Sequence, residues 1–186
     1  MGGLVSSSEI AMSETTRAQF QIEAMTDDDW PEVRRVYAQG IATGVATLES
    51  ETPDWNHFDH SHRHDCRLIA RERSGGPVLG WTALTAYSAR RVYAGVAWES
   101  VYVATEARGR GVGRALLEAL IPASEAAGLW TLLAGVLADN AASLALHDSV
   151  GFRRVGVERG LGQDPGGRLR DVVLLERRSS VVGINR

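Results

Sequence analysis

Hydrophobic and polar positions recur along the chain with two different periods, and each period predicts a type of element. In "QFQIEAM", Phe20, Ile22 and Ala24 alternate with polar residues, which predicts a half-buried strand. In the following "TDDDWPEVRRVYAQGI", apolar residues recur every three or four positions, which predicts an amphipathic helix. Thr26 with Asp29 three residues later resembles the capping box that begins a helix, although the usual third residue is Glu or Gln.

The later segments continue this order. Residues 44–64 have mixed polarity without a clear period, so we expect a loop that includes at most a short helix. The run "DNAASLALHDSVGF" predicts a helix that begins after Asn140 and ends before Gly151. Pro122 should kink or divide the helix predicted over residues 112–128. Further strands are predicted over residues 66–73, 77–87, 92–105, 129–138, 153–160 and 170–178.

This alternation indicates a single α/β (α+β) domain over residues 19–178. Strands and helices alternate in its second half, so at least one parallel strand pair is expected there. Residues 1–18 are expected to be a disordered leader or tag, and residues 179–186 a short tail.

Composition excludes several classes of function. The 186 residues carry a net charge of −3 with a pI of about 6.0, so no global basic field favours nucleic acid. No segment has the roughly 18 apolar residues of a membrane span, and the first residues lack the regions of a signal peptide. The single cysteine, Cys66, excludes an internal disulfide and suits a reducing cytoplasm. The histidine-rich "WNHFDHSHRHDC" matches no metal-ligand spacing, so we expect no metal.

The stretch "EARGRGVGRALL" carries glycines and arginines directly before an apolar helix. It lacks the lysine of a P-loop, and its Gly-x-Gly-x-Gly spacing differs from the Gly-x-Gly-x-x-Gly of a dinucleotide site. RNA-binding arginine-glycine segments are repeated, whereas this one is single. Two interpretations remain. The strand, loop and helix offer backbone N–H groups to an anion, or the segment is a tight turn with solvated arginines.

Two motifs resemble one known family. "RGRGVG", from Arg108 to Gly113, is similar to the Gln/Arg-x-x-Gly-x-Gly/Ala pyrophosphate loop of the GCN5-related N-acetyltransferases (GNAT). "NAASLALHDSVGF" begins 27 residues later, at Asn140, and resembles a second segment of that family. "SVYVA", "ARRVYAGVA" and "GGRLRDVVLLERR" extend the likeness to the phosphinothricin acetyltransferase branch.

The resemblance implies a GNAT-type domain with a mixed central sheet of about six to seven strands flanked by helices. It implies a cytoplasmic homodimer that transfers an acetyl group from acetyl-CoA, with no metal, to the amine of a small amino-acid-like substrate. Such an enzyme would have no nucleic-acid or membrane partner. The residues that would contact acetyl-CoA are Val101, Tyr102, Val103, Arg108, Gly109, Arg110, Gly111, Val112, Gly113, Arg114, Asn140 and Ser143. A plain N-capping role for Asn140 is compatible with this contact.

The family's mechanism needs a base, because an ammonium has no lone pair with which to attack the thioester. The likeness places Trp98 where a Glu is expected and Glu99 one position later. A one-residue shift turns a side chain to the opposite face of a regular strand, but the family's usual β-bulge can re-aim it. Glu99 is therefore a candidate base and equally a salt-bridged glutamate. His147 or Tyr102 is a candidate acid for the thiolate, and each has an ordinary structural alternative.

The acceptor site is also inferred from the branch. Arg90 matches an arginine that would pair with a substrate carboxylate, with surface charge as the alternative. Leu48 and Leu169 stand where the branch typically has Phe and Trp, which would alter the walls of the substrate pocket. Three alternatives remain open: a polyamine or aminoglycoside acceptor, a protein N-terminus, and a non-catalytic acyl-CoA sensor.

Overall fold

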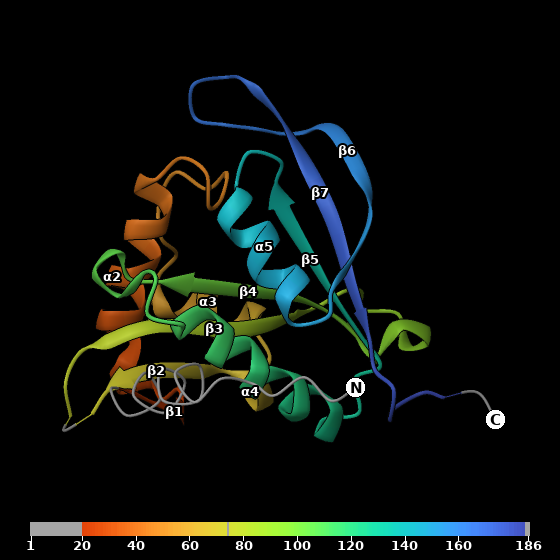
Figure 1. Cartoon of the computed structure of the whole chain (residues 1–186), viewed down its shortest axis with the longest axis horizontal. Coiled ribbons are helices and arrows are strands. Elements are labelled where there is room, and N and C mark those ends of the chain that lie inside the picture. The colour runs from red at the N-terminus through yellow and green to blue at the C-terminus, as the bar shows by residue number, and fades with distance from the viewer. Residues whose placement is uncertain (1–19, 74, 185–186) are drawn as a thin grey trace, which may run out of the picture.

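The computed structural model describes residues 20–73 and 75–184, and they form one seven-stranded sheet with helices on both faces (Figure 1). The element order is the one that the sequence predicts, whereas the predicted leader lies outside the described residues. The helices are α2 (Trp30–Ala42), α3 (Trp55–Ser61), α4 (Val112–Ala126) and α5 (Ala141–Ser149). The strands are β1 (Phe20–Ala24), β2 (Leu68–Glu72), β3 (Val78–Ala86), β4 (Val96–Val103), β5 (Thr131–Leu137), β6 (Arg153–Gln163) and β7 (Leu169–Arg178).

The strands lie in the order β1-β2-β3-β4-β5-β7-β6. Every neighbouring pair of these described strands is antiparallel except β4 and β5, which confirms the expected parallel pair. The connection from β4 to β5 passes through α4, as a parallel crossover requires.

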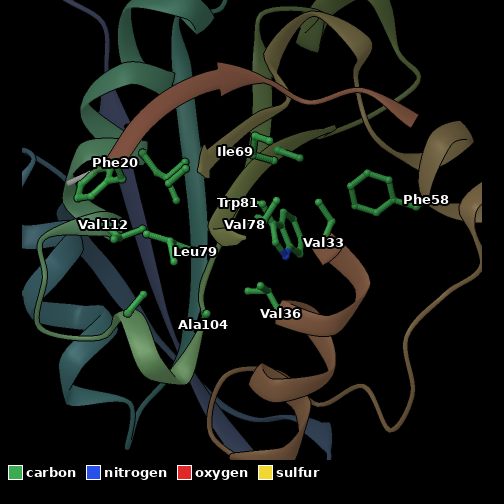
Figure 2. Packing of buried hydrophobic residues seen from close by; sticks show 14 residues of the cluster. Phe20, Val33, Val36, Phe58, Ile69, Val78, Leu79, Trp81, Ala104 and Val112 are labelled. Carbon is green, nitrogen blue, oxygen red and sulfur yellow. The ribbon is translucent and has the colours of Figure 1, made fainter. Parts of the chain in front are cut away.

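Helix α2 covers one face of the sheet through the apolar stripe that its sequence predicts. Val33 and Val36 are fully buried and pack in one cluster with Trp81 of β3 and Phe58 of α3, as Figure 2 shows. A 3-10 turn precedes the helix, and the Asp29 carboxylate accepts hydrogen bonds from both the backbone N–H and the hydroxyl of Thr26. The predicted capping box is therefore present with Asp in its third position.

Helix α4 covers the opposite face of the sheet. Leu116, Leu117 and Leu120 are buried, and α4 approaches β3 closely at Gly80, where an added Cβ would lie 3.1 Å from Leu116. The helix continues through Pro122, so of the two predicted effects of this proline, a kink or a division, the division is wrong. The carboxyl end of α4 is closed instead by Gly128, whose φ of 80° lies in the left-handed region.

The parallel pair positions the functional cleft. Pairing between β4 and β5 covers only Val96–Trp98 on one strand and Thr131–Leu133 on the other. The strands then diverge, and α5 lies beside the gap (Figure 1). Among the described strands, none pairs with the β5-facing edge of β4 beyond Trp98. The backbone groups along that edge are therefore available to a ligand.

Candidate active site

A cavity of about 450 Å³ opens where β4 leaves β5, and we call it the β4–α4 cavity. Its walls come from the end of β4, the glycine loop, the start of α4, helix α5 and the residues that follow α2. The structure thus brings together most of the predicted acetyl-CoA residues: Val101, Tyr102, Val103, Arg108, Gly109, Gly111, Val112, Gly113, Arg114, Asn140 and Ser143.

The three glycines of the loop have different roles. Gly109 and Gly111 have φ angles of 73° and 79°, in the left-handed region that a side chain disfavours. Gly111 is the N-cap of α4, and the first N–H groups of a helix have no partners within the helix. The first residues of α4, Val112 to Arg114, line the cavity. A Cβ at Gly113, in contrast, would lie 3.0 Å from Leu146 and 3.3 Å from Val103. Gly113 therefore serves the close packing of α4 against α5 and β4.

The arginines of the loop also separate in space. Arg108 and Arg114 line the β4–α4 cavity, and Arg114 is additionally paired with Glu118 one turn later. Arg110 does not line this cavity, and its guanidinium lies 3.2 Å from the Glu72 carboxylate. The prediction that Arg110 contacts the cofactor is therefore not supported by the geometry.

Strand β4 decides which of Trp98 and Glu99 faces the cleft. Its register with β3 continues without a shift from Ala97 opposite Ala86 to Val103 opposite Gly80, so the bulge that the resemblance implies is absent from this pairing. Alternation in a regular strand places Trp98 and Glu99 on opposite faces. The Trp98 ring lies 6.1 Å from that of Tyr87, whereas Glu99 points toward α5.

Glu99 and His147 form a buried pair. Their side chains are 2% and 1% exposed, and His147 Nε2 lies 2.5 Å from Glu99 Oε1. The other ring nitrogen, Nδ1, is 2.7 Å from the carbonyl oxygen of Ser143. Because a carbonyl only accepts, Nδ1 carries a proton, and the contact between Nε2 and Oε1 holds one further proton.

The protonation of His147 follows from this geometry. Burial of the ring lowers its pKa, but the hydrogen bond and the negative charge of Glu99 outweigh burial, with the Ser143 carbonyl adding to them. The net result is a raised pKa, which favours the imidazolium. Both ring nitrogens are occupied within the protein, so His147 does not itself reach a ligand.

The second carboxylate oxygen of Glu99 is free. Among the described residues, Oε2 is buried without a hydrogen-bond partner. Glu99 lines a small cavity of about 70 Å³, the Glu99 cavity, whose walls also include Ala46, Ser100, Tyr102, Asn140 and Ser143. Asn140, Ser143, Val101, Tyr102 and Ala46 also line the β4–α4 cavity, so the two cavities are contiguous. An unpaired buried carboxylate oxygen is costly and indicates a position prepared for a hydrogen-bonding ligand.

Tyr102 lies on the opposite face of β4 from Glu99. Its ring stacks on Trp81 at 4.7 Å, and burial raises the pKa of its hydroxyl far above the ordinary value. The hydroxyl therefore keeps its proton, which makes it a poor acid and a poor base but a competent hydrogen-bond donor.

Asn140 is the N-cap of α5 and also lies in the walls of the cleft. Its Oδ1 accepts a hydrogen bond from the Ser143 N–H and caps α5, while its Nδ2 donates to the Val45 carbonyl at 3.0 Å. The same residue lines both the β4–α4 cavity and the Glu99 cavity. It thus joins the start of α5 to the segment after α2.

The predicted acceptor residues lie elsewhere. Arg90 is exposed, its guanidinium lies over the ring of Tyr93, and it lines neither of these cavities. Leu48 packs against Gly162, where an added Cβ would lie 2.2 Å from its Cδ1. Leu169 is 64% exposed at the start of β7. In a single chain, the three side chains do not form the walls of a common pocket with Glu99.

A third cavity of about 550 Å³, the α2–α3 cavity, was not foreseen from the sequence. Tyr37 lines it, and the Tyr37 ring lies 4.6 Å from that of Tyr102, which borders the Glu99 cavity. Its other walls are Glu49, Glu51, Thr52, Pro53, Asp54, His57, Ser61 and His62, which include three carboxylates and no arginine or lysine. The segment has no period, so the sequence carried no signal that it borders a site.

No three or more His, Cys, Asp and Glu side chains within residues 20–73 and 75–184 come together as a metal site would require. Over the same ranges, none of the helices has both the length and the apolar character needed to cross a membrane.

The fold and the cleft together define a class of protein: an α/β domain whose central sheet opens between two diverging parallel strands, beside a glycine loop at the start of a helix. A model of the acetyltransferase (GNAT) family matches residues 22–152. The chain therefore belongs to the GNAT family, and it is an acetyl-CoA-dependent N-acetyltransferase.

Individual relatives confirm the resemblance to the phosphinothricin acetyltransferase branch. The chain is 36% identical to the phosphinothricin N-acetyltransferase of Alcaligenes faecalis over 88% of its own length and 85% of the relative's. It is 31% identical to an L-methionine sulfoximine/L-methionine sulfone acetyltransferase of Pseudomonas aeruginosa, over 73% and 81% of the two chains.

Solved structures show the same fold. A phosphinothricin acetyltransferase from Sinorhizobium meliloti, in complex with acetyl-CoA, is similar with a TM-score of 0.80 at 24% identity, over 90% of this chain and 92% of the other. A ribosomal-protein-alanine N-acetyltransferase from Brucella melitensis is similar with a TM-score of 0.75 at 30% identity, over 86% and 99%.

Proposed function

We propose that this enzyme acetylates the primary amine of a small amino-acid-like acceptor, with Glu99 as the base. The observation that carries this proposal is the buried Oε2 of Glu99, which has no hydrogen-bond partner among the described residues, on a residue that lines the Glu99 cavity beside the β4–α4 cavity. Relatives that acetylate phosphinothricin, methionine sulfoximine and methionine sulfone support the acceptor class.

The residues of the β4–α4 cavity fit acetyl-CoA, which supplies the activated acetyl group. Left-handed Gly109 and the start of α4 offer backbone N–H groups, and Arg108 and Arg114 offer positive charge, where the pyrophosphate would lie. The unpaired edge of Val101–Val103 offers backbone groups to the peptide-like pantetheine arm.

Glu99 acts on the acceptor. Its Oε2 accepts a proton from the ammonium of the acceptor, directly or through one water, so that the amine nitrogen gains the lone pair that attacks the thioester carbon. The carbon–sulfur bond then breaks, and the departing thiolate takes a proton from solvent or from the acceptor nitrogen. Glu99 is the one side chain in the Glu99 cavity that carries a carboxylate.

His147 acts as a positioning residue. Its Nδ1–H donates to the Ser143 carbonyl, which fixes the ring, and its Nε2–H binds Oε1 of Glu99. The carboxylate is thereby held with Oε2 toward the cavity and its negative charge balanced. This arrangement replaces the direct protonation of the thiolate by His147 that the family resemblance suggests.

A second acceptor class is favoured by a specific observation. The three carboxylates of the α2–α3 cavity, without a lysine or arginine among its walls, suit a basic amine such as a polyamine or aminoglycoside better than a second carboxylate. The likeness to a ribosomal-protein-alanine N-acetyltransferase keeps a protein N-terminus as a further candidate.

Thiol release from acetyl-CoA tests these candidates. The panel would contain phosphinothricin, methionine sulfoximine, methionine sulfone, spermidine, kanamycin and a peptide with an N-terminal alanine. Turnover that is highest on the amino-acid analogues supports the proposal, whereas highest turnover on spermidine or kanamycin supports the basic acceptor. Tight binding of acetyl-CoA without turnover on any amine would identify an acyl-CoA sensor.

The homodimer and the cytoplasmic location that the resemblance implies belong to the same proposal. Sedimentation of the purified protein would test the first, and cell fractionation the second.

A further inference from the structure

The loop that joins α2 to α3, residues 43–54, borders all three cavities. Thr43, Val45 and Ala46 line the β4–α4 cavity, Ala46 also lines the Glu99 cavity, and the residues from Glu49 onward line the α2–α3 cavity. The loop contains neither helix nor strand, so its own backbone hydrogen bonds do not fix its position. Side chains from elsewhere must do so.

Arg170 of β7 provides one such anchor. Its Nη1 donates to the Gly44 carbonyl at 3.2 Å and lies 3.4 Å from the Asp164 carboxylate, while its Nη2 binds Asp139 at 2.6 Å. The side chain is only 10% exposed. A planar guanidinium places its donors in a rigid fork and can hold three acceptors from three segments at once, whereas the three donors of a lysine share one nitrogen on a flexible stem.

Two further contacts hold residues that follow Gly44 in the loop. Asn140 donates to the Val45 carbonyl at 3.0 Å. Leu48 rests on Gly162 of β6, where the absence of a side chain gives it room. The loop is therefore held against the β6–β7 hairpin and the turn before α5, and both contacts with the hairpin depend on residues of β6 and β7.

We propose that Arg170 is a positioning residue for the acceptor, which places the α2–α3 loop so that Ala46 closes the Glu99 cavity and Glu49 faces the α2–α3 cavity. Arg170 itself is not among the lining residues of the three cavities. This inference rests on the proposed function, because it assumes that an amine binds beside Glu99. It predicts that loss of the guanidinium weakens productive binding of the acceptor more than binding of acetyl-CoA, whose other contacts come from β4, α4 and α5.

Replacement of Arg170 tests the proposal kinetically. Arg170→Gln should raise the acceptor KM by about tenfold or more, because displacement of a positioning element by roughly 1 Å costs up to about 100-fold. The Kd of acetyl-CoA should change by less than about threefold. Arg170→Lys, which keeps the charge but not the fork, should restore part of the acceptor KM. Arg153→Gln is the matched control, since Arg153 also pairs with a carboxylate on this hairpin, Glu176, but is far more exposed and has no contact with the loop.

A second pair of variants approaches the loop from β6. In Gly162→Ala the new Cβ would meet Leu48 Cδ1 at 2.2 Å and push this flexible side chain away. In Gly156→Ala, on the same strand, the Cβ meets nothing within 4 Å. Gly162→Ala should therefore reproduce the rise in acceptor KM, and Gly156→Ala should not. These variants keep the test valid if Arg170→Gln fails to fold.

Hydrogen exchange separates the failure of this inference from failure of the proposed function. Amides of residues 44–50 should exchange faster in Arg170→Gln than in the wild type, with the hairpin turn at Asp164 unchanged, because its carboxylate accepts from the N–H groups of Gly166 and Arg168 independently. If the wild type acetylates no amine, the proposed function fails. Separately, unchanged hydrogen exchange of residues 44–50 in Arg170→Gln would overturn the proposal that Arg170 positions the α2–α3 loop. If the wild type is active, an unchanged acceptor KM in Arg170→Gln, or an equal loss of acceptor and acetyl-CoA binding, overturns the positioning role alone.

Discussion

The donor end and the acceptor end of the cleft are built in different ways. At the donor end, Val101 to Arg114 supply most of the walls from one continuous stretch of strand, loop and helix. At the proposed acceptor end, Glu99 contacts His147 and Arg170 contacts the α2–α3 loop, so the residues of this end come from distant segments. The donor end should therefore tolerate changes elsewhere in the chain, whereas the acceptor end should respond to substitutions that touch no ligand.

The largest effect is expected at Glu99. Glu99→Gln removes the proton acceptor but keeps the size of the side chain, so kcat should fall about 10²- to 10⁴-fold. The Kd of acetyl-CoA, measured by calorimetry, should stay within about threefold because the donor end is built separately. Glu158→Gln, at an exposed position of β6, serves as the control. A kcat within tenfold of the wild type would place the base elsewhere.

A glycine pair sharpens the comparison from the donor end. Gly109→Ala and Gly128→Ala both place a side chain at a left-handed φ, 73° and 80°, and both Cβ atoms meet nothing within 4 Å. Each should lose about 1 kcal/mol of unfolding free energy in denaturant titrations. Only Gly109 lines the β4–α4 cavity, so only Gly109→Ala should also raise the Kd of acetyl-CoA, by about tenfold. Equal Kd values for the two variants would show that the loop does not hold the cofactor.

The pH dependence of stability tests the Glu99–His147 pair. The pKa of His147 is raised in the folded state above an unfolded value of about 6.5. The contribution of the His147–Glu99 pair to the free energy of unfolding is therefore fully present below the unfolded pKa of His147. It is lost as the pH rises through the folded pKa. The stability difference between the wild type and His147→Gln should be larger at pH 6 than at pH 9, by up to about 1.4 kcal/mol per unit of raised pKa. Urea titrations at the two pH values measure this difference, and a difference independent of pH would mean that His147 is neutral in the pair.

The smallest effect is expected at Arg90. Because its guanidinium lies over Tyr93 and outside the three cavities, Arg90→Ala should change the acceptor KM by less than about twofold. Steady-state kinetics with methionine sulfone would measure it. An acceptor KM raised tenfold or more would support the predicted pairing of Arg90 with a substrate carboxylate. It would require that Arg90 reach the acceptor in an assembly of two chains.

The outcomes for particular elements show where sequence reasoning succeeds. The period of apolar residues predicted α2 with its buried Val33 and Val36, and the order of strands and helices is confirmed. The glycine loop was located because its glycines and arginines lie together directly before an apolar helix. Gly113 lines the β4–α4 cavity with the other two glycines, but its need to be a glycine arises from Leu146, which lies 33 positions later in the chain.

The sequence by itself determined the element order, the glycine loop and the identity of the donor, because each depends on residues close together in the chain. Only the tertiary structure decided that β4 runs without the expected bulge, that Glu99 meets His147 from 48 positions away, and that Arg170 holds a loop 126 positions earlier. It also decided that Arg90, Leu48 and Leu169 lie outside the cavities. The physical reason is that backbone geometry follows local preferences, whereas the pairing of buried charges is selected among all the segments that folding brings into contact.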